Sequence, residues 1–206
     1  MHILLAVALS VTIGLFYWSK RRLIDLFNTA DTVDYPYDVV SLLTEMLTGQ
    51  TKDPIKIFLA SNLHIRESRY NLDKRVLYIG SSTPETITHL IVAAHEGGHA
   101  IQHDKGLLLL LRPPEIVLFF LPVLLCLNGL PVIRSVLLVE LASQALKLIT
   151  EIDAWRRACQ FLQQINFPAI SLAKKMCTAA LTSHTLIPLV ALILLVLLWN
   201  LKLFGF

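Results

Sequence analysis

Charged residues, cysteine and glycine are all scarce in this 206-residue chain, and their scarcity excludes several classes of protein. Asp, Glu, Lys and Arg make up 16% of the residues, against about 25% in an ordinary soluble domain, and 55% of the residues are hydrophobic. This composition excludes a disordered chain and a collagen-like repeat. The three cysteines are too few and too unevenly spaced for a disulfide framework or a cysteine-rich zinc site. The net charge of +3 is too small to indicate nucleic-acid binding.

Charge is nearly missing from both ends of the chain, where residues 1–19 and 184–206 together carry only Lys202. The mean hydropathy of +0.63 also argues against a wholly soluble protein. Residues 1–19 carry no charged side chain and are followed by Lys20-Arg21-Arg22. A cleaved signal peptide has its positive charge before the apolar run, so this pattern indicates an uncleaved N-terminal transmembrane anchor. Residues 184–206 contain a second aliphatic run, which predicts a C-terminal transmembrane helix.

The middle of the chain holds a third apolar region. Residues 106–150 predict a transmembrane or membrane-associated helical hairpin, with Asn128-Gly129 as turn residues at its tip. A single span over residues 116–133 is the alternative. The positive-inside rule would then place residues 20–105 and 151–183 in the cytoplasm. The sequence thus predicts a multi-pass protein of the cell membrane, with the lipid bilayer as a partner.

Residues 20–105 form the main polar block, and its pattern is α+β. Short runs of β-forming residues alternate with Asn and Asp, which is typical of strands joined by tight turns. We expect a turn at Asn71-Leu72-Asp73. The sequence predicts a helix over residues 36–48 and strands over residues 55–59, 63–66 and 75–79. With the apolar segments added, the expected fold is mainly helical α+β.

A further helix is strongly indicated near the end of this block. Thr83 is a good N-cap residue, and Pro84 suits the first helical position. Apolar residues then recur at helical spacing as far as Ile101, so one face of this helix is expected to be buried. The helix carries the sequence His95-Glu96-Gly97-Gly98-His99, which is an H-E-x-x-H motif.

The motif predicts a metal site because residues four apart share one face of a helix. His95 and His99 can therefore bind one ion through their neutral imidazoles, which are good ligands for Zn2+. Glu96 lies beside them, placed to act as the general base that takes a proton from the attacking water. A chance match on an amphipathic helix is the alternative interpretation, and the well-signalled helix favours zinc over it.

A catalytic zinc site usually has three protein ligands and one open position, so a third ligand is needed. His103 lies one turn after His99, but a third position along a straight helix points away from a tetrahedral centre, and we expect this histidine at the surface. No H-E-x-x-H-x-x-G-x-x-H pattern is present, which excludes a metzincin. The residue types leave six candidates open, namely His103, Asp104, Glu115, Glu140, Glu151 and Asp153.

Two helical motifs resemble those of a known family. The segment Val92–His103 is similar to the signature of the bacterial membrane-bound neutral zinc metallopeptidases, the YugP-like peptidases. The family's second signature resembles Glu151-Ile152-Asp153-Ala154, and the segment Tyr70–Leu77 resembles the turn and strand before the active helix. The resemblance covers roughly residues 36–160. More distantly, the layout is similar to that of HtpX-type and CAAX prenyl proteases.

This resemblance implies a zincin-like catalytic unit in which Glu151 is the third metal ligand and Glu96 is the general base. The interval between His99 and Glu151 is also long enough for two crossings of a bilayer core of ~30 Å, which would return Glu151 to the side of the histidines. The related proteases have an aspartate four residues after the glutamate ligand. Here that position is Trp155, which puts a supporting role there in doubt.

The sequence does not assign a single role to the other polar residues near the motifs. Asp153 either substitutes for the missing aspartate or forms a surface pair with Arg156 or Arg157, which lie three and four residues later. Peptide hydrolysis also benefits from a group that stabilises the tetrahedral oxyanion. The polar candidates for that group are Tyr70, His64 and Arg157.

The predicted function is that of a membrane-bound zinc-dependent metalloendopeptidase that hydrolyses membrane or membrane-associated proteins at the cytoplasmic face. We expect the substrate to lie extended along an edge strand, with residues 75–79 as the candidate. One alternative is a site-2-type intramembrane protease, although the motif helix is short and polar for that class and no Asn-Pro-Asp-Gly element follows. The other is a catalytically idle membrane scaffold that retains the metal site, which the intact Glu96 argues against.

Overall fold

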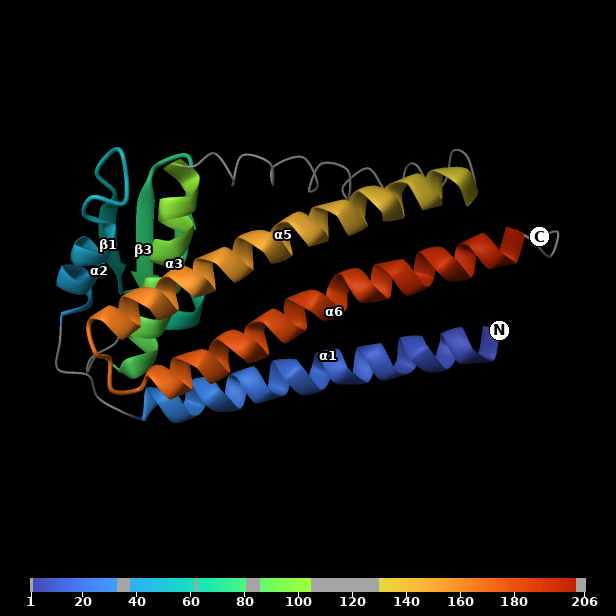
Figure 1. Cartoon of the computed structure of the whole chain (residues 1–206), viewed down its shortest axis with the longest axis horizontal. Coiled ribbons are helices and arrows are strands. Elements are labelled where there is room, and N and C mark those ends of the chain that lie inside the picture. Colours follow the sequence, from blue (N-terminus) through green and yellow to red (C-terminus); the bar gives the residue numbers. More distant parts are fainter. Residues whose placement is uncertain (1, 33–37, 62, 81–85, 105–129, 203–206) are drawn as a thin grey trace. The chain divides into compact units, whose positions relative to one another are not determined.

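A computed structural model describes residues 2–32, 38–61, 63–80, 86–104 and 130–202 (Figure 1). These residues form five α-helices, one 3-10 helix and a three-stranded sheet, so the described chain is mainly helical α+β. The elements in chain order are α1 (His2–Asp31), α2 (Val39–Leu47), β1 (Lys56–Ala60), η1 (Ile65–Glu67), β2 (Arg69–Asn71), β3 (Val76–Gly80), α3 (Ile87–Asp104), α5 (Leu130–Gln164) and α6 (Ile170–Lys202).

The chain divides into two compact units. One unit comprises Met1–Arg22, Leu110–Ile149 and Ala179–Phe206, and its described residues are all helical. The other comprises Leu23–Leu109 and Thr150–Thr178. This second unit contains the sheet, α2, α3 and the last part of α5, and it includes the whole H-E-x-x-H motif together with Glu151.

The expectation of a multi-pass membrane protein is wrong for the part of the chain that the structure describes. None of its helices combines the length and the apolar character that crossing a bilayer requires. The predicted anchor is only the first part of α1, which continues through Lys20-Arg21-Arg22 to Asp31. The predicted C-terminal helix is likewise only the last part of a longer helix, α6, which begins at Ile170. The localisation in the cell membrane, which rested on these spans, is corrected with them.

The predicted hairpin is only partly within the described residues. Its first arm and its tip at Asn128-Gly129 lie outside them. The expected return arm is the start of α5, which begins at Leu130 with Pro131 in its first turn, where a missing N–H costs nothing. The helix does not stop at residue 150, because no Gly or Pro follows until Pro168. Arg134, Glu140 and Lys147 also break up this arm, and it does not qualify as a span.

The sheet has the strand order β1-β3-β2. Strand β1 pairs parallel to β3, with Ile57 opposite Leu77, and β2 pairs antiparallel to β3, with Tyr70 also opposite Leu77. The predicted strands over residues 55–59 and 75–79 are present, each shifted by one residue. However, β3 is the central strand, so the expectation that residues 75–79 form an edge is wrong.

The predicted strand over residues 63–66 is absent, and the 3-10 helix η1 lies there instead. Local side-chain hydrogen bonds explain the difference, because they compete with strand pairing. The His64 N–H donates to Glu67 Oε2 at 3.1 Å, and the Ser68 hydroxyl donates to the Ile65 carbonyl at 2.6 Å. The turn that follows, at residues 72–75, then joins β2 to β3 near the predicted position.

Both helices of the α/β layer begin at side-chain caps. Asp38 caps α2 by accepting hydrogen bonds from the Val40 and Ser41 N–H groups. The described part of α3 begins at Ile87, while the predicted cap and first position at residues 83 and 84 lie outside the described residues. Thr86 stands at the N-cap position, and its N–H donates to His89 Nδ1 at 3.0 Å, much as the glutamate of a capping box accepts from the cap residue.

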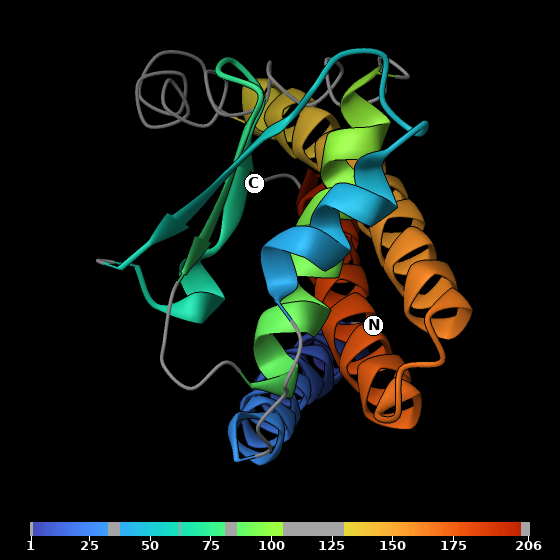
Figure 2. The same cartoon turned by 90° about the vertical axis from the view of Figure 1, so that its left-hand side faces the viewer.

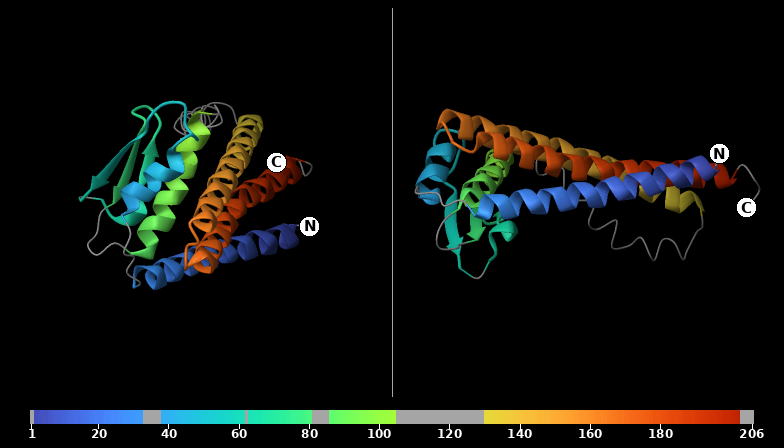
Figure 3. Two further views of the ribbon diagram at one scale, coloured as in Figure 1. Left: turned by 60° about the vertical axis from the view of Figure 1, so that its left-hand side comes forward. Right: turned by 90° about the horizontal axis from the view of Figure 1, so that it is seen from below.

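Helices α2 and α3 cover one face of the sheet, and the last part of α5, from Thr150 onward, lies on the far side of α3 (Figures 2 and 3). The core lies between these layers. Leu77 of β3 and Leu43 of α2 are fully buried, as are Leu90 and Ile91 of α3. Packing on both sides thus fixes α3, the helix that carries the motif, between the sheet and α5.

Candidate metal centre

The two histidines of the motif meet a glutamate from α5. His95 Nε2 lies 3.3 Å from one carboxylate oxygen of Glu151, and His99 Nε2 lies 3.6 Å from the other. The three possible ligand atoms all fall within 4.8 Å of one another. Each side chain is 13–15% exposed, so the cluster is largely withdrawn from water but open to a small ion.

The donor set fits a zinc-type ion. Two imidazole nitrogens and one carboxylate oxygen are the ligand types that Zn2+ takes in catalytic sites with one open position. Burial lowers the pKa of His99, and the neighbouring His95 lowers it further, which favours the neutral imidazole that binds metals.

A close approach of two helices brings Glu151 to the histidines. A Cβ atom placed on Gly98 would lie 2.6 Å from the Ala154 carbonyl oxygen and 2.9 Å from Ala154 Cα. Only glycine at this position therefore allows α3 to touch the backbone of α5. Glu151 lies one turn before Ala154 on the same face of α5, which directs its carboxylate at the histidines.

Glu96 is positioned beside the cluster without being part of it. Its Oε2 accepts a hydrogen bond of 2.8 Å from the backbone N–H of Tyr70 in β2. Burial raises the pKa of Glu96 to about 7, and this rise occurs although His99 and the Tyr70 N–H both act to lower the pKa. The carboxyl is thus able to accept and release a proton near neutral pH.

His95 and His99 are supported in different ways. The indole of Trp155 stacks on the His95 ring, with centroids 4.4 Å apart and planes at 28°. His95 Nδ1 is buried and has no hydrogen-bond partner in the described part of the chain. By contrast, His99 Nδ1 lies 3.0 Å from Gln102 Oε1. Trp155 therefore contacts His95 through its ring, at the position four residues after Glu151.

The other candidate ligands do not join the cluster. His103 is half-buried rather than at the surface, and its Nδ1 lies 2.7 Å from the Tyr70 hydroxyl. Asp153 forms the expected pairs with Arg156, at 2.5 Å, and with Arg157, at 2.8 Å. Glu140 lies about three turns before Glu151 on α5. Asp104 ends α3, and Glu115 lies outside the described residues.

The three candidates for an oxyanion-stabilising group lie in different surroundings. His64 is exposed, and the Nε of Arg157 donates to Asp153. Tyr70 contacts Glu96 through its backbone N–H, and its hydroxyl is bonded to His103. Of the three, Tyr70 is the residue that a hydrogen bond ties directly to the motif.

Sequence reasoning missed Gln102, although a signal for it exists. This glutamine lies three residues after His99, so the two share a face of α3. A polar residue at this spacing, one turn after a predicted metal ligand, indicates a hydrogen-bonding role beside that ligand. Gln102 is indeed wholly buried and contacts both His99 and α5.

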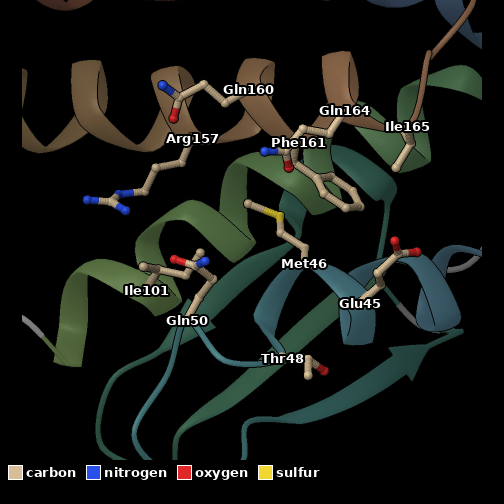
Figure 4. Close-up of a pocket in the computed structure, with 10 residues that line it drawn as sticks. All are labelled: Glu45, Met46, Thr48, Gln50, Ile101, Arg157, Gln160, Phe161, Gln164 and Ile165. Atoms are coloured by element: carbon tan, nitrogen blue, oxygen red, sulfur yellow. The ribbon is translucent and has the colours of Figure 1, made fainter.

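A cavity of about 230 Å³ lies between α2, α3 and α5 (Figure 4). It is mostly polar, and Arg157, Gln160 and Gln164 of α5 face Glu45 and Gln50 across it. None of the three clustered ligands lines this cavity, so it is distinct from the candidate metal centre. No protein-family model, curated protein or solved structure matches the chain, so its function is inferred from the residues of the site themselves.

Proposed function

We propose that this chain is a zinc-dependent metallopeptidase. The observation that carries the proposal is the meeting of His95, His99 and Glu151, with Glu96 held beside them by a backbone N–H rather than among the ligands. A structural ion would need only ligands, whereas a hydrolase also needs a proton acceptor next to an open coordination position. The resemblance of the two helical motifs to zinc metallopeptidases supports the same chemistry.

Each residue has a defined part in peptide hydrolysis. His95, His99 and Glu151 would hold the ion, which when bound acts as a Lewis acid toward a carbonyl oxygen and makes water more acidic. Glu96 accepts a proton from the water that attacks the peptide carbonyl. The same carboxyl then donates this proton to the amide nitrogen as the C–N bond breaks. The products are a carboxylic acid and an amine, and Glu96 returns to its starting state.

A peptide is a suitable substrate because a strand edge lies beside the base. Strand β2 is an edge strand of the described sheet, and its Tyr70 N–H points away from β3 toward Glu96. An extended peptide that added to this edge would pair through its backbone, without regard to its sequence. This arrangement supports a protein or peptide substrate. The strand expected to bind the substrate is then β2, not residues 75–79.

Two variants of the full chain test the proposal. Glu96→Gln should retain zinc with unchanged stoichiometry and lose hydrolysis of an unfolded protein substrate by several orders of magnitude, because the amide cannot accept the proton. Glu151→Ala should lose zinc as well as activity, because one of the three ligands is gone. Zinc content by elemental analysis and cleavage by mass spectrometry measure the two effects. Hydrolysis by Glu96→Gln at the wild-type rate would refute the mechanism, and zinc-loaded wild type without any cleavage would refute the proposed function.

A further inference from the structure

The side-chain amide of Gln102 is fixed in orientation by two acceptors on α5. Its Nε2 donates to the Thr150 carbonyl at 2.6 Å and to Asp153 Oδ2 at 3.1 Å. A carbonyl oxygen and a carboxylate oxygen can only accept, so the NH2 end of the amide must face them. The Oε1 end must therefore face His99, 3.0 Å from Nδ1.

The orientation of this amide determines the tautomer of His99. Gln102 Oε1 has no hydrogen to donate, so His99 Nδ1 must carry the proton that makes the bond. A neutral imidazole with its proton on Nδ1 has its lone pair on Nε2. That nitrogen is the one that faces Glu151 in the metal cluster.

Asp153 is itself anchored at the outer end of this chain of hydrogen bonds. Arg157 donates to the same Oδ2 that accepts from Gln102, at 2.8 Å, and Arg156 donates to Oδ1. Arg157 is 16% exposed, whereas Arg156 is 63% exposed. Hydrogen bonds between ionised groups are strong when partly buried, so Arg157 is the more important anchor.

We propose that Gln102 is a positioning residue that, with Asp153 and Arg157, holds His99 in the Nδ1–H tautomer and so prepares its Nε2 as a metal ligand. This role rests on the proposed metal centre and adds a supporting network to it. His95 receives no such bond in the described chain, because Trp155 stacks on its ring there.

The first test reads the tautomer in the metal-free full chain. Nitrogen-15 NMR of the histidine side chains distinguishes Nδ1–H from Nε2–H imidazole without any metal or substrate. In the wild type His99 should be the Nδ1–H form. In Gln102→Met, which keeps the volume of the side chain but removes the acceptor, both tautomers should be populated. A wild-type His99 protonated on Nε2 would overturn the proposal.

The second test measures metal binding with Co2+ as a spectroscopic probe and with a competing chelator for Zn2+. Gln102→Met should weaken metal binding by about 10–100-fold and alter the visible spectrum of bound Co2+. Gln160→Met is the matched control, since Gln160 is an exposed glutamine of α5 that lines the separate cavity (Figure 4), and it should bind as the wild type does. Equal affinity and equal spectra for both variants would overturn the proposal.

Variants of the outer residues remain informative if Gln102→Met does not fold. Asp153→Asn can still accept a hydrogen bond from Gln102, so its metal affinity should change little, whereas Asp153→Leu should approach the effect of Gln102→Met. An Asp153→Leu protein with wild-type affinity and Co2+ spectrum would contradict the network. Failure of the wild type to bind any metal would instead refute the proposed function, while the NMR measurement would still report on the tautomer.

Discussion

Replacing Gly98 with alanine should separate the two helices that build the metal centre. The added Cβ would lie 2.6 Å from the Ala154 carbonyl oxygen, and ordinary contact begins near 3.4 Å, so α5 must retreat by roughly 0.8 Å. Both atoms of this contact belong to helical backbone or are attached directly to it, so neither can rotate away. Glu151 would move with α5, and metal–ligand distances tolerate only about ±0.2 Å.

The effect on stability is smaller than the effect on metal binding. Overpacking costs about 1–3 kcal/mol, but alanine in place of glycine favours a helix by about 1 kcal/mol. The metal-free Gly98→Ala protein should therefore lose about 0–2 kcal/mol in its free energy of unfolding. Its zinc affinity should fall on the order of tenfold or more, because the third ligand no longer reaches the ion.

The neighbouring glycine supplies the matched control. A Cβ on Gly97 would meet Met46 Sδ at 3.0 Å and Leu43 Cδ2 at 3.3 Å, and both are the ends of flexible side chains. Gly97→Ala should therefore leave zinc affinity unchanged. Chelator competition measures the affinity of both variants, and urea unfolding in EDTA measures their stability. If Gly98→Ala binds zinc as tightly as Gly97→Ala, the close approach of α3 and α5 does not position Glu151.

Two further predictions concern the cap of α2 and the ring stack. The Ser41 hydroxyl and the two backbone N–H groups lower the pKa of Asp38 below 3.8, outweighing burial, so its stabilising effect is present above pH 3.8 and is lost as the pH falls through the lowered pKa. Asp38→Ala should cost about 1 kcal/mol in urea unfolding at pH 7, and this gap should close in acid, whereas Asp38→Asn should remain a good cap throughout. Trp155→Ala should cost about 3–5 kcal/mol of stability and also weaken zinc binding, while Trp155→Phe should retain most of both, because a ring still faces His95. Equal zinc affinity for Trp155→Ala and the wild type would show that the stack does not hold His95.

Local sequence patterns predicted the elements whose formation depends on local forces. The helical spacing of apolar residues up to Ile101 indicated α3, and β-forming runs located β1 and β3 to within one residue. Strand β2 was missed because it has only three residues, and it exists through pairing with β3. The run at residues 63–66 has the composition of a strand, but the side chains of Glu67 and Ser68 bond to the adjacent backbone and favour η1.

The apolar runs misled the sequence reasoning about the rest of the chain. Composition over a window does not show where a helix begins and ends, and α1 and α5 both continue far beyond the runs that suggested them. The site was easier to anticipate, because an H-E-x-x-H motif is a local pattern on one helix. What could not be read from the sequence was the contact that completes it. The packing of Gly98 on Ala154 joins residues remote in the chain, and no periodicity encodes it.

A single turn of α5 brings together most of what the metal centre requires. Glu151 supplies the carboxylate, Ala154 supplies the backbone atoms against which Gly98 packs, and Trp155 stacks on the ring of His95. These three positions are spaced i, i+3 and i+4, so they share one face of the helix. Asp153 lies on the flank and reaches Gln102. The close packing of Gly98 against Ala154 on this face aligns α5 with α3, and this alignment is what positions Glu151 beside the two histidines.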